Sequence, residues 1–215
     1  MTRKLVILGS GGHGSSVADA VLSNPEYELV GFIDKGEGET YLDIPIIGDD
    51  GDLPKLSRLG IEFGFIGVGY TGGVDFRPKL VSVIEEANMR LATIVDASAH
   101  LAQDVTLGRG TFVGKGAVLN ACSSLGEGCI VNSGAIVEHG CAIGDYSHIA
   151  VGAVLCGDVI VGKRVFVGAN ATVLPGVRIG DGAVVGAGSI VLGDVPDEAV
   201  VYGVHKKGSR CGQRH

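Results

Sequence analysis

The sequence lacks most of the signatures of a secreted or disulfide-stapled protein. It has no tryptophan, six phenylalanines and five tyrosines, so a core built on large aromatic side chains is not expected. Its five cysteines are an odd number and form no C-x-x-C pair, which indicates neither a disulfide framework nor a zinc ribbon. We therefore expect reduced cysteines, no metal and a cytoplasmic location.

Long apolar segments and a basic excess are also missing. No run approaches the roughly 18 apolar residues of a membrane span, and glycine breaks the N-terminal apolar stretch too soon for a signal peptide. Lysine and arginine together number 17 against 24 acidic residues, a net charge of −7. The charge argues against a chain that coats nucleic acid or an anionic membrane, so we expect neither as a partner.

Apolar residues and glycine are abundant instead. Hydrophobic residues make up 46% of the 215 positions, enough to bury a substantial core. Glycine occupies 37 positions and proline only six, against an ordinary glycine usage of about 7%. This combination favours many regularly spaced tight turns over low-complexity disorder.

A six-residue repeat runs through the second half of the chain. Sixteen positions at a spacing of six, from Leu101 to Val191, are all leucine, isoleucine or valine. Four residues after each one, from Val105 to Val195, lies a residue that is small or β-branched. The period predicts one short strand and one turn per hexad, with three hexads forming an 18-residue triangular coil and coils stacked about 4.8 Å apart. Glycine follows the aliphatic residue in eight of the sixteen hexads, and turns of this kind need glycine or asparagine to reach positive φ.

The first half has the element order of a small Rossmann-like α/β domain. An apolar run at 3–8 leads into the glycine turn 9–14 (Gly-Ser-Gly-Gly-His-Gly), then a helical pattern, then a buried strand at 29–33 that ends in Asp34. Fewer than 100 residues are small for a complete NAD domain, so a mononucleotide or nucleotide-linked sugar fits better. Further elements are expected as a helix at 53–59, a strand at 63–69, a helix at 77–88 and a strand at 91–95. The residues expected to bind this substrate are Gly11, Gly12, His13, Asp34, Lys35 and Gly67.

These patterns predict three segments. Residues 1–98 form the nucleotide-sugar-binding α/β domain, residues 99–195 form the β-helix that carries acetyl-CoA and catalysis, and residues 196–215 form a C-terminal tail.

The glycine turn, the run Phe32-Ile33-Asp34 and the stretch 132–149 (Asn-Ser-Gly-Ala-Ile-Val-Glu-His-Gly-Cys-Ala-Ile-Gly-Asp-Tyr-Ser-His-Ile) resemble the bacterial sugar acyltransferases of the NeuD/PglD type. The resemblance covers nearly the whole chain. It implies a left-handed parallel β-helix, a homotrimer with active sites between subunits, and acetyl-CoA bound along the helix. The implied activity is N-acetylation of a nucleotide-linked amino sugar, with UDP as the favoured nucleotide.

The resemblance also assigns roles to single residues. His139 matches the general base, and Gly157 matches the glycine whose N–H meets the thioester carbonyl. Asn132 matches a residue that lines the cleft, His148 one near the acetyl group, and Lys206, together with Lys207, is placed to meet the CoA phosphates. Independently, the repeat puts Gly157 one coil above His139, about 5 Å away.

The chain departs from the family pattern beside the base. Many relatives have an acidic residue directly after the catalytic histidine, and here Gly140 stands there. The group that orients His139 is therefore open at this stage, with Glu138 on its other side.

Other functions stay open as well. A sugar O-acetyltransferase would use the same base and donor, and a nucleotide-sensing trimer would use the glycine turn without catalysis. A hexapeptide-type carbonic anhydrase needs three histidines around zinc, whereas His139 and His148 are half a coil apart. A nicotinamide oxidoreductase is disfavoured by the size of the first domain.

Overall fold

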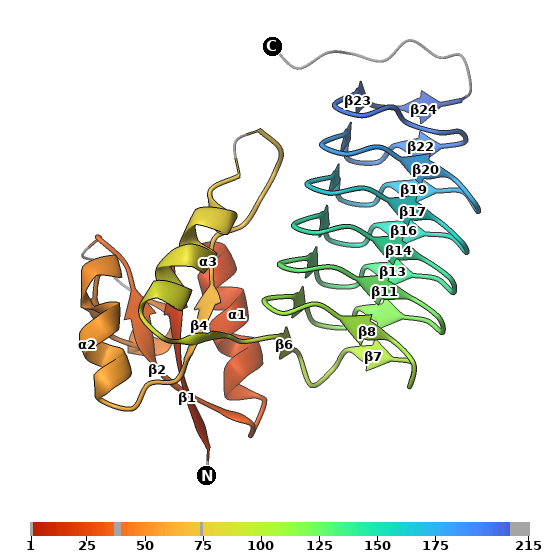
Figure 1. The fold of residues 1–215 in the computed structure, drawn as a ribbon. Coiled ribbons are helices and arrows are strands. Elements are labelled where there is room, and N and C mark those ends of the chain that lie inside the picture. Colours follow the sequence, from red (N-terminus) through yellow and green to blue (C-terminus); the bar gives the residue numbers. More distant parts are fainter. Residues whose placement is uncertain (1, 37–39, 74, 207–215) are drawn as a thin grey trace. The chain divides into compact units, whose positions relative to one another are not determined.

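The computed structural model describes residues 2–36, 40–73 and 75–206. They divide into two compact units (Figure 1). The α/β unit comprises Met1–Gly69 and Phe76–Ala97, and the repeat unit comprises Tyr70–Asp75 and Ser98–His215. No helix among the described residues is long and apolar enough to cross a membrane.

The α/β unit is built on a five-stranded parallel sheet in the order β3-β2-β1-β4-β5. The central strand β1 pairs with neighbours on both edges, and its residues Leu5–Leu8 are at most 1% exposed, which explains the continuous apolar run. The strands are β1 Arg3–Leu8, β2 Tyr27–Ile33, β3 Ile46–Gly48, β4 Phe63–Ile66 and β5 Arg90–Leu91. The helices are α1 Gly12–Leu22, α2 Leu53–Arg58 and α3 Arg77–Glu86, with short 3₁₀ turns at Tyr41–Asp43 and Asp50–Asp52.

Strand order fixes where this unit can bind a ligand. The chain leaves β1 toward β2 and β3 and later returns to β4 on the other side of β1. In open parallel sheets a ligand binds at the carboxyl ends of the strands where the order reverses. That place lies between the ends of β1 and β4, where the glycine turn begins.

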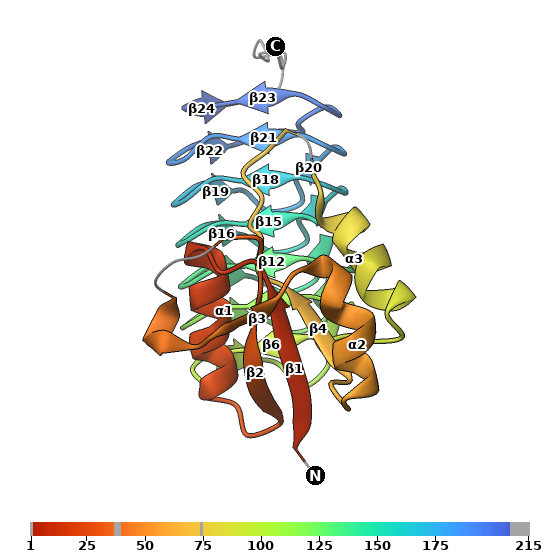
Figure 2. The same cartoon turned by 90° about the vertical axis from the view of Figure 1, so that its left-hand side faces the viewer.

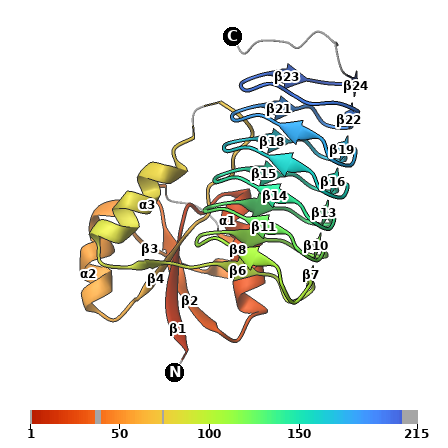
Figure 3. The same ribbon diagram turned by 45° about the vertical axis from the view of Figure 1, so that its right-hand side comes forward.

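The repeat unit is a left-handed β-helix of two-residue strands that recur every six residues from β7 to β22. Paired strands are 18 residues apart, as in Val118↔Ile136 and Ile130↔His148. One face stacks β9, β12, β15, β18, β21 and β23 (Figure 2), a second stacks β7, β10, β13, β16, β19, β22 and β24 (Figure 3), and the third stacks β8, β11, β14, β17 and β20. The predicted fold class is confirmed.

The bounds of the short strands follow the predicted aliphatic column, which supplies the second residue of each strand from β7 to β22. They are β6 Ile94–Val95, β7 His100–Leu101, β8 Thr106–Leu107, β9 Phe112–Val113, β10 Val118–Leu119, β11 Ser124–Leu125, β12 Ile130–Val131, β13 Ile136–Val137, β14 Ala142–Ile143, β15 His148–Ile149, β16 Val154–Leu155, β17 Ile160–Val161, β18 Phe166–Val167, β19 Thr172–Val173, β20 Arg178–Ile179, β21 Val184–Val185, β22 Ile190–Val191, β23 Val200–Val201 and β24 Val204–His205.

Both inward columns form the core of the β-helix. From Val113 to Val191 the aliphatic residues are at most 5% exposed. The polar members of the small column satisfy their hydroxyl groups by donating to a backbone carbonyl 15 residues later, as Ser123 does to Glu138 (2.9 Å) and Ser147 to Gly162 (2.7 Å). Cys141 donates similarly to Cys156 O at 3.2 Å, and burial raises the pKa of its thiol. These small residues therefore pack and hydrogen-bond at once.

Turn glycines fall into two columns with different causes. The positions at six-residue intervals from Gly110 to Gly188 all have φ between 52° and 72°, and the non-glycine ones include Asp158 and Asn170. The glycines directly after the aliphatic residues, which the sequence had linked to positive φ, instead face the backbone of the next coil. A Cβ on Gly108 would lie 2.3 Å from the carbonyl carbon of Gly126, so close approach is what this column requires.

Candidate active site

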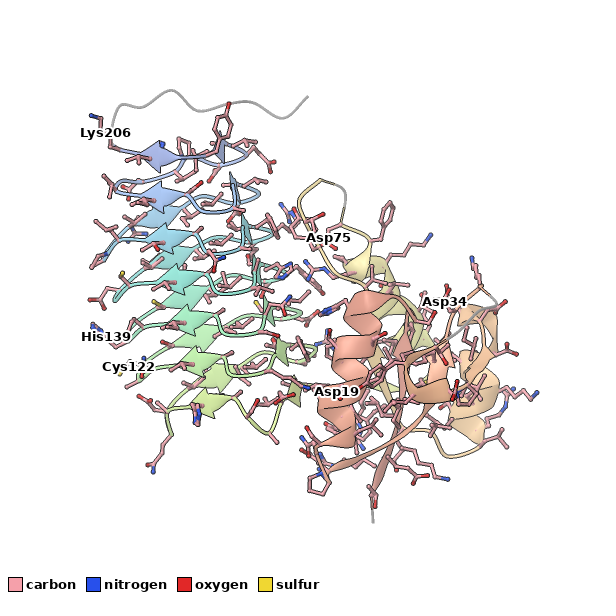
Figure 4. All side chains as sticks on the ribbon, turned by 180° about the vertical axis from the view of Figure 1, so that it is seen from behind. Asp19, Asp34, Asp75, Cys122, His139 and Lys206 are labelled. Atoms are coloured by element: carbon pink, nitrogen blue, oxygen red, sulfur yellow. The ribbon has the colours of Figure 1, made fainter. Side chains whose placement is uncertain are left out.

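His139 and Gly157 lie at the same corner of the β-helix on adjacent coils. β13 ends at Val137, and the turn that follows leaves the His139 side chain exposed at an edge of the repeat unit (Figure 4). The imidazole packs against the coil above it. A Cβ on Gly157 would lie 2.5 Å from Cε1 and 2.6 Å from Nε2 of His139, so only glycine leaves the ring its place.

The Gly157 amide is free to bind an additional group. Its carbonyl accepts a hydrogen bond from Gly176 N at 3.0 Å, but within the described part of the chain its N–H donates to no protein atom. A backbone N–H held beside an imidazole is the arrangement that stabilises an oxyanion formed next to a general base.

Glu138 does not hold the imidazole. Its Oε1 accepts from the Asn120 side-chain amide at 3.0 Å, and its Oε2 accepts from the His139 backbone N–H at 3.3 Å. This carboxylate is therefore tied to the coil below and to the backbone of the turn.

Asn132 and His148 meet on a different face. His148 begins β15 and is 7% exposed, and its ring packs edge-on to Phe166 with centroids 5.3 Å apart. Its Nδ1 lies 2.5 Å from the carbonyl oxygen of Tyr70, so Nδ1 carries the proton and Nε2 is left as an acceptor. The Asn132 amide nitrogen lies 3.5 Å from that Nε2.

Tyr70 was missed by the sequence analysis. It is 4% exposed, and its hydroxyl donates to Arg164 O at 3.0 Å, so the segment Tyr70–Asp75 belongs to the repeat unit. No sequence signal marks it, because Gly-Tyr-Thr-Gly-Gly reads as an ordinary turn.

The structure thus forms two separate groups from the four predicted residues of the repeat unit. His139 and Gly157 share one corner, and Asn132 and His148 share another face, because nine residues are half a coil. No group of three His, Cys, Asp or Glu residues that could hold a metal ion occurs in the described ranges.

Lys206 lies at the far end of the described coils. It follows β24, is exposed, and stands four coil steps above the coil of His139 through the hydrogen-bonded series 138, 156, 174, 192. At about 4.8 Å per coil the two levels are roughly 19 Å apart. Lys207, named with it, lies outside the described residues.

In the α/β unit the predicted glycines divide into open and packed positions. Gly11 is the N-cap of α1 and Gly12 its first residue; both are exposed, and a Cβ on either would meet nothing within 4 Å. No acidic residue occupies the first turn of α1, so its free N–H groups favour an anion. By contrast, a Cβ on Gly67 would lie 2.7 Å from Gly9 O, which makes Gly67 a packing position. His13, in the first turn, is half-buried.

Asp34 connects the end of β2 to the glycine turn. Its Oδ2 accepts from both the N–H (2.8 Å) and the hydroxyl (2.7 Å) of Ser10, and Oδ1 accepts from Lys35 N at 2.7 Å. The Ser10 hydrogen bonds lower the pKa of Asp34, so the carboxylate stays ionised. Asp34 and Lys35 also line a pocket of about 1030 Å³ at the carboxyl ends of β2 and β3.

Comparisons with known proteins fit both units. Residues 4–71 match the model of the PglD N-terminal domain, and residues 158–192 match the hexapeptide repeat of succinyl-transferase. A structure of perosamine N-acetyltransferase from Caulobacter crescentus, a histidine-to-asparagine variant with CoA and GDP-perosamine, is 32% identical with a TM-score of 0.89 and covers 98% of this chain and 97% of its own. The chain belongs to the PglD/NeuD-type family of sugar acyltransferases.

A second member of this family is similar over nearly the same length. The acetyltransferase domain of PglB from Neisseria gonorrhoeae, with acetyl coenzyme A, is 29% identical with a TM-score of 0.87 and covers 94% of this chain and 97% of that one. A search of curated proteins gave no significant match. Family membership confirms the predicted resemblance and the acyltransferase class.

Proposed function

We propose that this family member transfers the acetyl group of acetyl-CoA directly to the amino group of a nucleotide-linked amino sugar. The observation that carries the proposal is the exposed imidazole of His139 packed over Gly157, whose N–H has no partner in the described residues. Relatives with CoA and GDP-perosamine, or with acetyl coenzyme A, support the two substrate classes.

His139 acts as general base in this mechanism. The sugar nitrogen attacks the thioester carbonyl carbon, and His139 takes the proton that the amine loses. When the C–S bond breaks, the imidazolium returns that proton to the departing sulfur. The products are an amide and free CoA thiol, with no covalent enzyme intermediate.

Gly157 stabilises the tetrahedral state. The carbonyl oxygen gains negative charge as the nitrogen attacks, and a fixed N–H binds that oxyanion more strongly than the neutral carbonyl. Having no side chain, Gly157 leaves both the imidazole and the thioester room at this corner.

The α/β unit binds the nucleotide part of the acceptor. The open N-terminus of α1 at Gly11 and Gly12 suits the diphosphate, with His13 beside it. The neighbouring pocket with Asp34 and Lys35 supplies polar groups for the nucleoside. UDP was favoured by the sequence resemblance, while the C. crescentus relative holds GDP-perosamine, so the test includes both nucleotides.

The repeat unit binds acetyl-CoA along its length. With the thioester at His139, an extended pantetheine arm running along the stack ends near the level of Lys206, where an ammonium group can meet CoA phosphates. Asn132 and His148 line the cleft from the other face. Because one protomer holds them on a different face from His139, a complete site requires a neighbouring subunit, which supports a homotrimer.

A substrate panel tests the proposal. Acetyl-CoA is offered with UDP- and GDP-linked 3-amino and 4-amino hexoses, and thiol release is followed together with product mass. We expect release with at least one acceptor and a product that gains one acetyl group. Mild alkali then separates the sugar O-acetyltransferase alternative, because an ester is cleaved and an amide survives. Nucleotide binding without CoA binding in a calorimetric titration would overturn the proposal in favour of a non-catalytic trimer.

A further inference from the structure

The residue after His139 has no side chain, and a carboxylate from the next coil occupies the space that is left. A Cβ on Gly140 would lie 2.2 Å from Oδ1 of Asp158, and the Asp158 N–H donates to His139 O at 2.8 Å. The two side chains therefore cross at this corner: the imidazole packs upward over Gly157, and the carboxylate packs downward over Gly140.

The same backbone arrangement occurs elsewhere in the β-helix without a charge. A Cβ on Gly152 would lie 2.3 Å from Oδ1 of Asn170, and Asn170 N donates to Val151 O at 2.9 Å. Both crossing residues have positive φ, 61° at Asp158 and 54° at Asn170. The turn accepts a neutral amide equally well, so its geometry does not require the negative charge of Asp158.

The surroundings of His139 leave Asp158 as the unengaged acid. Glu138 is bound by Asn120 and by the turn backbone. On the coils below, Cys122 N donates to Asp104 at 2.9 Å, and hydrogen bonds from Cys122 lower the pKa of Asp104. Within the described residues the Asp158 carboxylate has no hydrogen-bond or ion-pair partner.

The charge lies close enough to act on the ring. Neighbouring Cα atoms are about 3.8 Å apart and neighbouring coils about 4.8 Å, which puts carboxylate and imidazole on the order of 5 Å apart. No lysine or arginine stands on this corner between residues 102 and 177 to neutralise the acid.

We propose that Asp158 is a positioning residue for His139, which attracts the imidazolium as it forms and keeps the ring over Gly157. The proposal rests on the proposed role of His139 as the base. An acid at this position, supplied by the adjacent coil, would explain how the site works with Gly140 directly after the histidine. A charge 5 Å away in water changes an equilibrium about four-fold.

Titration of the imidazole tests the proposal without any substrate. The His139 ring signals are assigned by their loss in His139→Gln and followed against pH by NMR in the full-length protein. In Asp158→Asn we expect the titration midpoint of His139 to fall by about 0.6 pH unit. In the matched variant Asn170→Asp, which adds a charge in the same geometry beside Val151, the midpoint stays where it is. An unchanged midpoint in Asp158→Asn overturns the proposal.

Kinetics provide the second readout. We expect Asp158→Asn to lower kcat about four-fold, to move the acidic limb of the pH–rate profile to lower pH and to leave KM for both substrates within two-fold. Asn170→Asp should leave all three unchanged. A KM effect with an unmoved pH profile would show a merely structural role and overturn the proposal. Failure of the proposed function is distinguishable, since unaltered turnover in His139→Ala removes the base while the NMR titration still reports on Asp158.

Discussion

The two units use glycine in opposite ways. In the repeat unit every position has equivalents 18 residues away, so a residue that matters for chemistry is visible as a departure from its column, as His139 is among exposed turn residues. In the α/β unit there is no repeat, and each glycine has its own surroundings. There, only the atoms that a Cβ would meet separate Gly12, which faces open space, from Gly14, where a Cβ would lie 2.1 Å from Gly9 O. Sequence spacing alone locates function in the first case and not in the second.

The largest expected effect tests the repeat unit. His139→Ala removes the proposed base, so we expect kcat to fall by about 10²- to 10⁴-fold, the usual contribution of general base catalysis. CoA affinity measured by calorimetry should stay within two-fold, because the imidazole acts on the amine proton. Wild-type turnover in this variant would contradict the assignment.

Gly157→Ala separates function from stability at the same corner. The added methyl meets only the far end of the His139 side chain, which can swing away, so the free energy of unfolding should change by less than about 1 kcal/mol. The displaced ring and the crowded N–H should lower kcat by about 10- to 100-fold. Gly144→Ala is the control: a Cβ there would lie 2.7 Å from the backbone carbonyl of Gly162, so urea unfolding should show a loss of stability.

Gly14→Ala and Gly12→Ala make the corresponding comparison in the α/β unit. A methyl on Gly14 overlaps backbone that cannot move aside, and we expect a loss of about 2–3 kcal/mol in the free energy of unfolding. Gly12→Ala should preserve stability or raise it by about 0.5–1 kcal/mol, because alanine favours the helix. Equal losses in denaturant titrations of both variants would show that the open and packed classes are not distinct.

The smallest effect concerns Asp34. Its folded-state pKa is lowered by Ser10, so its contribution to stability is present above the unfolded-state pKa, about 3.9, and is lost as pH falls through the lower folded-state value. Asp34→Asn should therefore cost about 1 kcal/mol at pH 7. The difference from wild type, followed by urea unfolding, should shrink only below about pH 4. A constant difference down to pH 3 would mean that the charge of Asp34 is not what stabilises the turn.

The sequence predicted the repeat unit in detail because its signal is redundant. Each aliphatic residue from Val113 to Val191 repeats the same constraint, so spacing identified the strands and the His139–Gly157 pair together. Single-copy features carried no such signal. β3 was not expected, the segment containing Tyr70 gave no sign of joining the repeat unit, and Asp158 looked like any other turn residue.

The α/β unit was predicted in outline but not in the roles of its residues. The glycine turn and the acid at the end of β2 were found by their order along the chain. Spacing could not show that both Asp34 oxygens accept hydrogen bonds from the chain itself or that Gly67 packs against Gly9, because those facts depend on which backbone atoms come together in three dimensions.

The hydrogen-bond register of the β-helix also restricts how this half of the molecule can change in length. Gaining or losing a complete 18-residue turn keeps every column in phase and alters only the reach between the imidazole and the last lysine. Any other change in number rotates the remaining faces and carries aliphatic side chains into water. Length variation here is quantised, so a longer or shorter acyl carrier would be accommodated in whole steps.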